Sequence, residues 1–273
     1  MSIVHNIISK RPLDISRLNT FASKIEGAIC ENRGEGTYYY WIDGKSTRGL
    51  NITLEQDLIE IRNMVLSNRY DYELTNKIVT EILSMTEGVI LNEDEEVEIN
   101  NPIFVNNKIS ENEIHDCEVI QILSKEHDVA IDGPIRKVHF GKRMFKNFKP
   151  LKGKQLKHKM FDLILKVNYE IPDFEIGNIM RVVNSEDDPK IMKVLTNETD
   201  YILDKYDYIL LYVPDKPIMI TNEILNTMLP SNWDLVDEYT IVAPITNQSE
   251  WDNLLNKAKK YDLWEKFTKK NEK

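Results

Sequence analysis

The stretch "TYYYWIDGKSTRGLNITLE", Thr37 to Glu55, decides how the first part of this chain folds. Its Gly-Lys-Ser-Thr run ends like a nucleotide-binding loop of pattern GxxxxGK[ST], but Tyr39 stands where that loop requires its first glycine. An aromatic, β-branched segment precedes the turn, and the alternating segment LNITLE follows it, so the context is strand–turn–strand and no helix starts here. Asp43-Gly44 is a common hairpin turn, and Gly49 can supply a second residue at positive φ. We therefore predict a turn between two strands and no bound nucleotide.

The segments around this hairpin predict an α+β arrangement. Residues 58–62 predict a third strand, and residues 70–88 predict the clearest helix of the chain, with Asp71 as its N-cap. Residues 13–25 predict an amphipathic helix, and "CENRGEG", which follows it, predicts a flexible break. Residues 110–135 fit a short helix in one part and a strand in another, and we leave them open.

A second set of elements follows in the C-terminal part. "MFDLILKVNYEI", starting at Met160, and "YDYILLYV" predict strands, and the sequence ends in a helix with Ser249 as its expected N-cap. We predict an α+β fold of two mixed or antiparallel sheet modules, each with helices packed on one face. The expected parts are an N-terminal module (1–135), a basic connecting segment (136–159) and a C-terminal module (160–273).

Composition restricts the class of protein. The chain has 273 residues, of which 41% are hydrophobic and 29% charged, as in ordinary globular proteins. Cys30 and Cys117 belong to no CxxC pair, which argues against a disulfide framework or a zinc finger. Neither a signal-peptide core nor a run of about 20 apolar residues is present in the sequence, so we expect a cytoplasmic protein without a membrane partner. The sequence leaves the oligomeric state open.

Charge is distributed unevenly along the chain, whose net charge is −10. Residues 1–135 hold 12 basic and 24 acidic residues, residues 136–159 hold 10 basic and none acidic, and residues 160–273 hold 13 and 21. Three phenylalanines interrupt the basic strip, a composition typical of nucleic-acid binding. The candidate residues for this alternative function are Arg136, Lys137, Lys142, Arg143 and Lys146. The competing explanation is that the phenylalanines are buried and the cations are solvated or paired with acidic neighbours.

One group of residues could bind a metal ion or form a catalytic centre. His115, Asp116 and Cys117 are adjacent, and His127 and His139 follow within the same region. Their spacing matches no known zinc site, and the chain has neither a GxSxG elbow nor a kinase-like glycine loop. We predict no metal and no cofactor. A hydrolase using His115, Asp116 and His139 is the second alternative function.

The leading hypothesis is a non-enzymatic protein-binding function. In an alternating strand, Tyr38 and Tyr40 face opposite to Tyr39 and Trp41, so one pair should be buried while the other can anchor a partner. The candidate contacts are Tyr39, Trp41, Lys45 and Arg48, the last two expected to be exposed. An acidic chain rich in Ile, Asn and Lys resembles bacterial immunity proteins or accessory partners of toxins, which implies a complementary, basic protein partner such as a nuclease.

Overall fold

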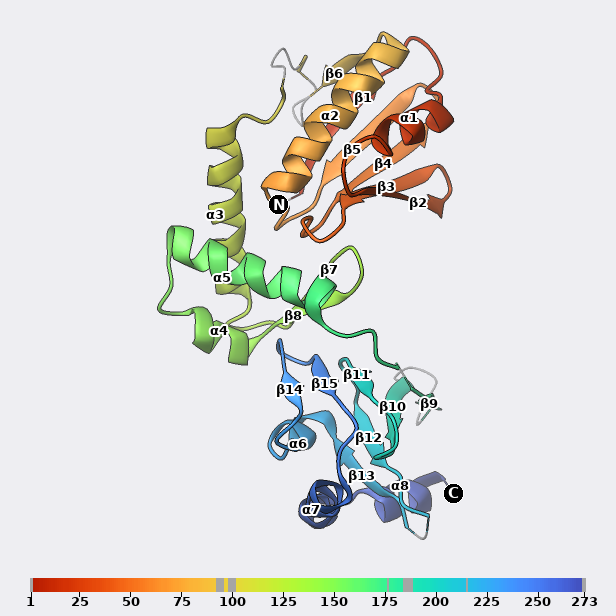
Figure 1. Cartoon of the computed structure of the whole chain (residues 1–273), viewed down its shortest axis with the longest axis vertical. Helices are drawn as coiled ribbons and strands as arrows, with labels where there is room; N and C mark the ends of the chain where they lie inside the picture. The colour runs from red at the N-terminus through yellow and green to blue at the C-terminus, as the bar shows by residue number, and fades with distance from the viewer. Residues whose placement is uncertain are drawn as a thin grey trace. The chain divides into compact units, whose positions relative to one another are not determined.

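A computed structural model of the chain describes residues 2–91, 96–97, 102–175, 177–183, 189–214 and 216–271. The chain divides into two compact units, residues 1–170 and 171–273. Both units combine helices with antiparallel or mixed sheets (Figure 1), so the predicted α+β fold is confirmed. Whether the expected boundaries at 135 and 159 separate independently folding domains stays a prediction. The basic segment 136–159 lies within the first unit.

The first unit begins with an antiparallel sheet, here named the N-terminal sheet, whose described strands run in the order β2-β3-β4-β5-β1-β6. Its strands are β1 (Ile3–Ile8), β2 (Ala28–Gly34), β3 (Thr37–Ile42), β4 (Leu50–Glu55), β5 (Leu58–Asn63) and β6 (Val89–Leu91). The predicted hairpin is present as β3 and β4. The flexible break expected at "CENRGEG" is wrong, because Cys30 to Gly34 belong to β2 and only the following residues form a tight turn into β3.

Two helices, α1 (Ile15–Ala22) and α2 (Arg69–Thr86), cover one face of the N-terminal sheet (Figure 1). Tyr40 and Ile52 from the strands pack with Ile78 of α2 in a core that excludes water, and all three side chains are fully buried. Along β4 and β5, buried residues alternate with less buried ones, as a sheet with one covered face requires.

The expected N-cap of α2 is wrong by three residues. The cap is Asn68, whose side chain accepts hydrogen bonds from the backbone N–H groups of Tyr70 and Asp71. Asp71 occupies the third helical position and accepts from the backbone N–H of Asn68, which completes a capping box. Helix α2 ends at Thr86, and its C-cap Glu87 has the left-handed conformation, one residue before Gly88, the last residue of the expected helix.

The rest of the first unit is a group of helices with a small hairpin. Its elements are α3 (Asn106–Leu123), β7 (Val129–Asp132), β8 (Lys137–Phe140), α4 (Lys142–Phe148), α5 (Gly153–Leu165) and a π-helical turn (Lys166–Glu170). The strand expected from Met160 is wrong. Helix α5 begins upstream at Gly153, and Leu156, Met160 and Ile164 recur at helical spacing and are fully buried. The strand expected from Met160 begins in the middle of this apolar stripe, so the segment shows only part of the helical spacing.

The second unit contains two described sheets, of strand orders β13-β12-β10-β9 and β11-β15-β14. Its elements are β9 (Ile179–Val183), β10 (Pro189–Leu195), β11 (Tyr201–Leu203), β12 (Tyr208–Leu211), β13 (Ile218–Thr221), α6 (Asn222–Asn226), β14 (Asp234–Leu235), β15 (Ile241–Ala243), α7 (Gln248–Ala258), a 3₁₀ turn (Lys259–Tyr261) and α8 (Trp264–Asn271). The N-cap of α7 is Asn247 rather than Ser249, because the Asn247 side chain accepts from the N–H of Glu250. Among the described residues, no helix has the length and apolar character needed to cross a membrane.

Candidate functional site

The loop between β3 and β4, residues 43–49, is a tight turn closed by its own backbone. The N–H groups of Lys45 and Ser46 donate to the carbonyl of Ile42 at 3.1 and 2.8 Å, and the Ser46 hydroxyl accepts from the Ile42 N–H at 2.8 Å. Gly44 and Gly49 have φ of +67° and +62°, which only glycine adopts without strain. The loop therefore joins two strands by backbone geometry, as predicted.

This loop also surrounds an anion, which is a carboxylate of the chain itself. Asp71 is fully buried, and its Oδ1 accepts from the N–H of Gly49 at 2.9 Å. Its Oδ2 accepts from the N–H groups of Arg48 at 3.1 Å and Asn68 at 2.9 Å. The Thr47 hydroxyl lies 3.0 Å from the same oxygen, but its single proton is shared with the carbonyl of Leu66 at 2.7 Å. Burial raises the pKa of Asp71, while these hydrogen bonds oppose the rise.

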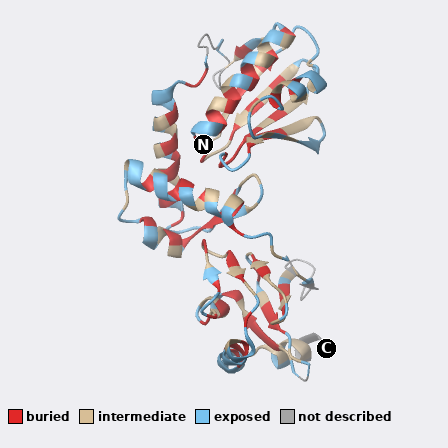
Figure 2. Cartoon of the chain, viewed as in Figure 1, coloured by how far each residue is buried: buried red, intermediate tan, exposed pale blue. Residues whose placement is uncertain are grey.

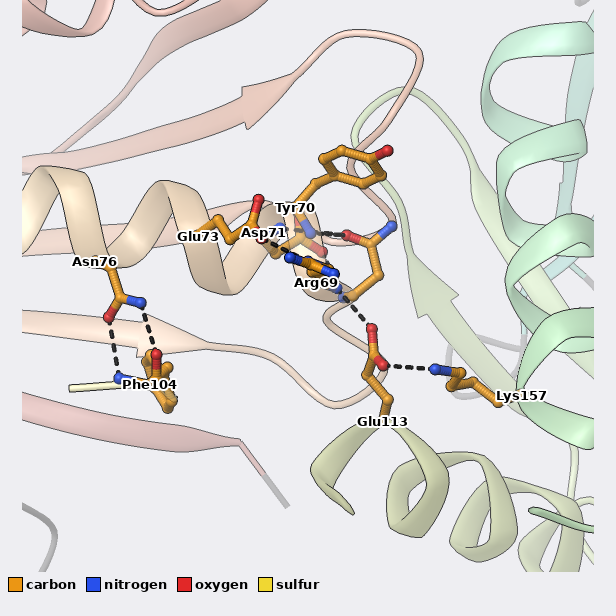
Figure 3. Close-up of polar contacts among 9 residues, drawn as sticks. Arg69, Tyr70, Asp71, Glu73, Asn76, Phe104, Glu113 and Lys157 are labelled. Atoms are coloured by element: carbon orange, nitrogen blue, oxygen red, sulfur yellow. Dashed lines mark hydrogen bonds and ion pairs between the residues drawn. The ribbon is translucent and has the colours of Figure 1, made fainter. Parts of the chain in front are cut away.

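Two further acidic residues tie the start of α2 to α3 and α5, as Figure 3 shows in part. Glu113 is 5% exposed, accepts from the backbone N–H of Arg69 at 2.7 Å and pairs with Lys157 at 2.8 Å. Asp116 accepts from the backbone N–H of Leu66 at 2.9 Å. These carboxylates serve as hydrogen-bond acceptors for the loops at the ends of the strands, which explains their burial without a catalytic role.

The two faces of the aromatic strand β3 lie in different environments. Tyr38 and Tyr40 pack toward the helices, whereas Tyr39 and Trp41 lie on the opposite face. Tyr39 and Trp41 stack with ring centroids 5.1 Å apart, and the guanidinium of Arg33 lies 3.6 Å from the centroid of Tyr39. Tyr39 is buried and donates from its hydroxyl to the carbonyl of Arg48 at 2.6 Å, while Trp41 is half-buried. Trp41 is therefore the aromatic side chain that reaches the surface of this face.

The two basic residues of the loop differ in exposure. Lys45 is exposed, as expected, with its Nζ 5.8 Å from the ring centroid of Tyr70. The expected exposure of Arg48 is wrong, because only 5% of this residue is exposed. Its amide and carbonyl are bound by Asp71 and Tyr39, which draws the residue into the protein. Burial lowers the pKa of the Arg48 guanidinium, and the nearby Tyr39, with other acidic groups, opposes the shift.

The basic strip separates into a buried and an exposed set. Phe140 and Phe148 are core residues with ring centroids 6.3 Å apart. The candidate cations lie on β8, α4 or the turn before β8, where the lysines are exposed and the arginines are half-buried: Lys137, Lys142, Lys146, Arg136 and Arg143. Phe140 and Phe148 thus support the surface rather than line it, whereas Phe145 on α4 is half-buried. The role of the cations stays a prediction.

The histidines of the second alternative point to different environments. His115 is exposed on α3, whereas its neighbour Asp116 is buried with a pKa raised by burial. His139 is buried on β8. Cys117, the neighbour of Asp116 on α3, is also buried, and this burial raises the pKa of its thiol. Within the described ranges, no group of three His, Cys, Asp or Glu side chains is arranged to hold a metal ion. The hydrolase alternative stays a prediction without a geometric argument in its favour.

Sequence reasoning missed Lys193, which is fully buried on β10. In the part of the chain that the structure describes, its Nζ has no hydrogen-bond partner, and the rings of Tyr201 and Tyr206 lie 5.9 and 5.5 Å away. Burial lowers the pKa of Lys193 to about 8, and the nearby Glu175 opposes the shift. The available signal was its place in the strand, two residues before the buried Leu195 and so on the same face.

No match to this chain was found among protein-family models, curated proteins or solved structures.

Proposed function

We propose that this chain is a non-enzymatic, bacterial protein-binding protein of the cytosol that engages a basic protein partner through the uncovered face of the N-terminal sheet. The observation that carries the proposal is the stacked pair Tyr39–Trp41 on the face opposite α1 and α2. An aromatic side chain at the surface, supported by a buried one, is the usual anchor of a protein interface.

The surroundings of Trp41 give this face an apolar centre. Ile29 on β2 pairs directly with Trp41 and is 40% exposed. Tyr39 is fixed by its hydrogen bond to the Arg48 carbonyl and by the Arg33 guanidinium over its ring, so the plane against which Trp41 stacks is already formed. When a partner covers Trp41, the Trp41 side chain loses little conformational entropy, because the indole is held in place before binding.

Charged pairs surround this apolar centre. Arg33 pairs with Glu31 at 3.1 Å on β2, and Arg62 pairs with Glu60 at 3.1 Å on β5, with all four side chains at least one-third exposed. Such pairs contribute little to stability and are available to a partner. Because acidic residues outnumber basic ones two to one in residues 1–135, a basic partner is favoured in the encounter. A basic toxin neutralised by an acidic immunity protein has this complementarity.

The partner is expected on the face of the sheet rather than on its edge. Strand β2, next to Trp41, is one of the two edge strands, and it carries Glu31 and Arg33. Its pairing with β3 is irregular between Asn32 and Gly34, where Arg33 lies. Charged side chains and irregular pairing are features with which proteins block strand addition at an exposed edge. Binding through the face leaves this protection intact.

The test is calorimetric titration with the purified products of neighbouring genes. Wild-type protein should bind one of them saturably, and Trp41→Ala should weaken that binding about tenfold or more, as expected when an interface anchor is removed. The matched control is Tyr212→Ala, which removes an aromatic side chain that is 51% exposed in the second unit and should leave the affinity unchanged. Absence of saturable binding to any candidate, or equal affinity of Trp41→Ala and wild type, would contradict the proposal.

A further inference from the structure

Six lysines on α4, on the connection after it and on α5 are each exposed to solvent, and this set is here named the lysine surface. Its members are Lys142, Lys146, Lys149, Lys152, Lys154 and Lys159. Figure 2 shows pale-blue exposed stretches in this part of the first unit, between buried and half-buried ones. Between residues 136 and 159 the sequence contains no acidic residue that could neutralise these cations locally.

Neighbouring lysines show that pairing is possible in this region but does not reach the lysine surface. Lys157 pairs with Glu113 at 2.8 Å, and Lys137 lies 3.8 Å from Asp132. Within the described ranges, none of the six members of the lysine surface has an acidic partner within 4 Å. Pairing with acidic neighbours therefore accounts for Lys157 and Lys137, but it gives the six members of the lysine surface no structural role.

Two of these charges lower the stability of the helix at whose N-terminus they lie. Lys152 is the N-cap of α5 and Lys154 is its second residue, while the first turn contains neither an acidic residue nor a side-chain cap. The positive end of the helix dipole disfavours cations at this place, and Ser, Asp or Asn would be the stabilising choice at the cap. Lysines that act against helix stability indicate a function outside the fold.

From these observations we infer that the lysine surface binds the phosphate backbone of a double-stranded nucleic acid without reading its sequence. Lysine offers a mobile point charge, suited to phosphate contacts that do not depend on one geometry. Phe140 and Phe148 are buried and Phe145 is half-buried, so none of the three phenylalanines is an exposed platform on which unpaired bases could stack, as single-strand binders require. The surface lies outside the Trp41 face, so the inference does not depend on the proposed protein partner.

Electrostatics limit this binding to a local contact. At about 0.1 M salt, charges beyond about 10 Å are largely screened, so the acidic residues elsewhere weaken the contact less than the total charge of −10 suggests. If all six lysines meet phosphates, the logarithm of the binding constant should fall with that of salt concentration with a slope of about −5 for a duplex. A slope near −4 is expected if the same contacts form on a single strand.

Fluorescence anisotropy measures this directly with labelled DNA and RNA duplexes of about 20 base pairs and a single strand of equal length, at roughly 25 to 200 mM salt. The variant K149Q/K152Q/K154Q should flatten the duplex slope by about 2.7, since each phosphate contact contributes about 0.9. The matched control K257Q/K259Q/K260Q removes the same charge from exposed lysines of α7 and the 3₁₀ turn, and should leave the slope unchanged.

A second variant separates binding from folding. Lys154→Glu should raise the Tm, because it places an acid at the N-terminus of α5, while it weakens duplex binding. Absence of duplex binding at the lowest salt would overturn the inference. So would equal losses in both triple variants, a Lys154→Glu protein that keeps the wild-type affinity, or tighter binding to the single strand than to the duplex. Competition by polyglutamate as strong as that by duplex would also overturn it and would assign the surface to an acidic protein.

Discussion

Replacing Asp71 with alanine tests whether the 43–49 loop is held by an internal carboxylate. The substitution leaves the N–H groups of Arg48, Gly49 and Asn68 buried without their acceptor, whereas the Thr47 hydroxyl keeps the Leu66 carbonyl. At about 1–3 kcal/mol for each unsatisfied donor the sum is about 3–9 kcal/mol, from which relief of the buried charge returns a part. We expect the free energy of unfolding to fall by about 3–5 kcal/mol.

Hydrogen exchange at increasing urea concentrations, detected by mass spectrometry, measures this loss of free energy of unfolding separately in each unit. Exchange should accelerate in peptides from β3, β4 and the start of α2, while peptides from β12 and β13 provide an internal control. Asp71→Asn should lie between alanine and wild type, because one of its two terminal groups can still accept hydrogen bonds. A loss below about 1 kcal/mol for Asp71→Ala, or an equal loss in both units, would refute the reasoning.

Three further tests address other parts of the structure. The pKa of Lys193 falls from 10.5 in the unfolded chain to about 8 in the folded protein. Between these pH values the unfolded chain binds more protons than the folded protein. The free energy of unfolding should therefore rise with pH across this window, by up to about 3 kcal/mol. Lys193→Met should abolish this rise in urea titrations at several pH values, and an unchanged rise would contradict the assignment. Gly49→Ala should cost about 2–4 kcal/mol, because its Cβ would lie 2.5 Å from the Tyr40 carbonyl oxygen. Gly44→Ala, at a similar positive φ but with open space around the new Cβ, should cost about 1 kcal/mol. Similar losses for both glycines in thermal melts would argue against the close approach. Lys157→Met should cost about 2 kcal/mol by leaving Glu113 buried without its cation, whereas the exposed Lys146→Met should change stability by less than about 0.5 kcal/mol, and equal effects would contradict the role of the pair.

Local patterns predicted the parts of the fold that depend on neighbours in sequence. The hairpin of β3 and β4 follows from alternation on both sides of Asp43-Gly44, and the stripe of α2 follows from helical spacing. Strand β1 was missed because its partners are β5 and β6, 50 or more residues away. Helix α5 was missed because its first turns lie in the segment 136–159, which was expected to be a connection, and the strand expected from Met160 begins in the middle of the helix.

The candidate site was less predictable because its contacts are long-range. Alternation showed that Tyr39 and Trp41 share a face, but only the packing of α1 and α2 shows that this face is the uncovered one. Asp71 was expected to cap its own helix, whereas it also binds amides 22 and 23 residues earlier, a contact that no local pattern contains. The same contact explains the burial of Arg48, which appears in the sequence as an exposed turn residue.

The most direct test of the proposed function is a hydrogen-exchange footprint of the bound partner. Once a saturating partner is found, exchange should slow in peptides that cover β2 and β3, including Trp41, while α1 and α2 on the other face keep their free-state rates. Protection confined to α1 and α2, or to the second unit, would contradict binding through the uncovered face of the N-terminal sheet.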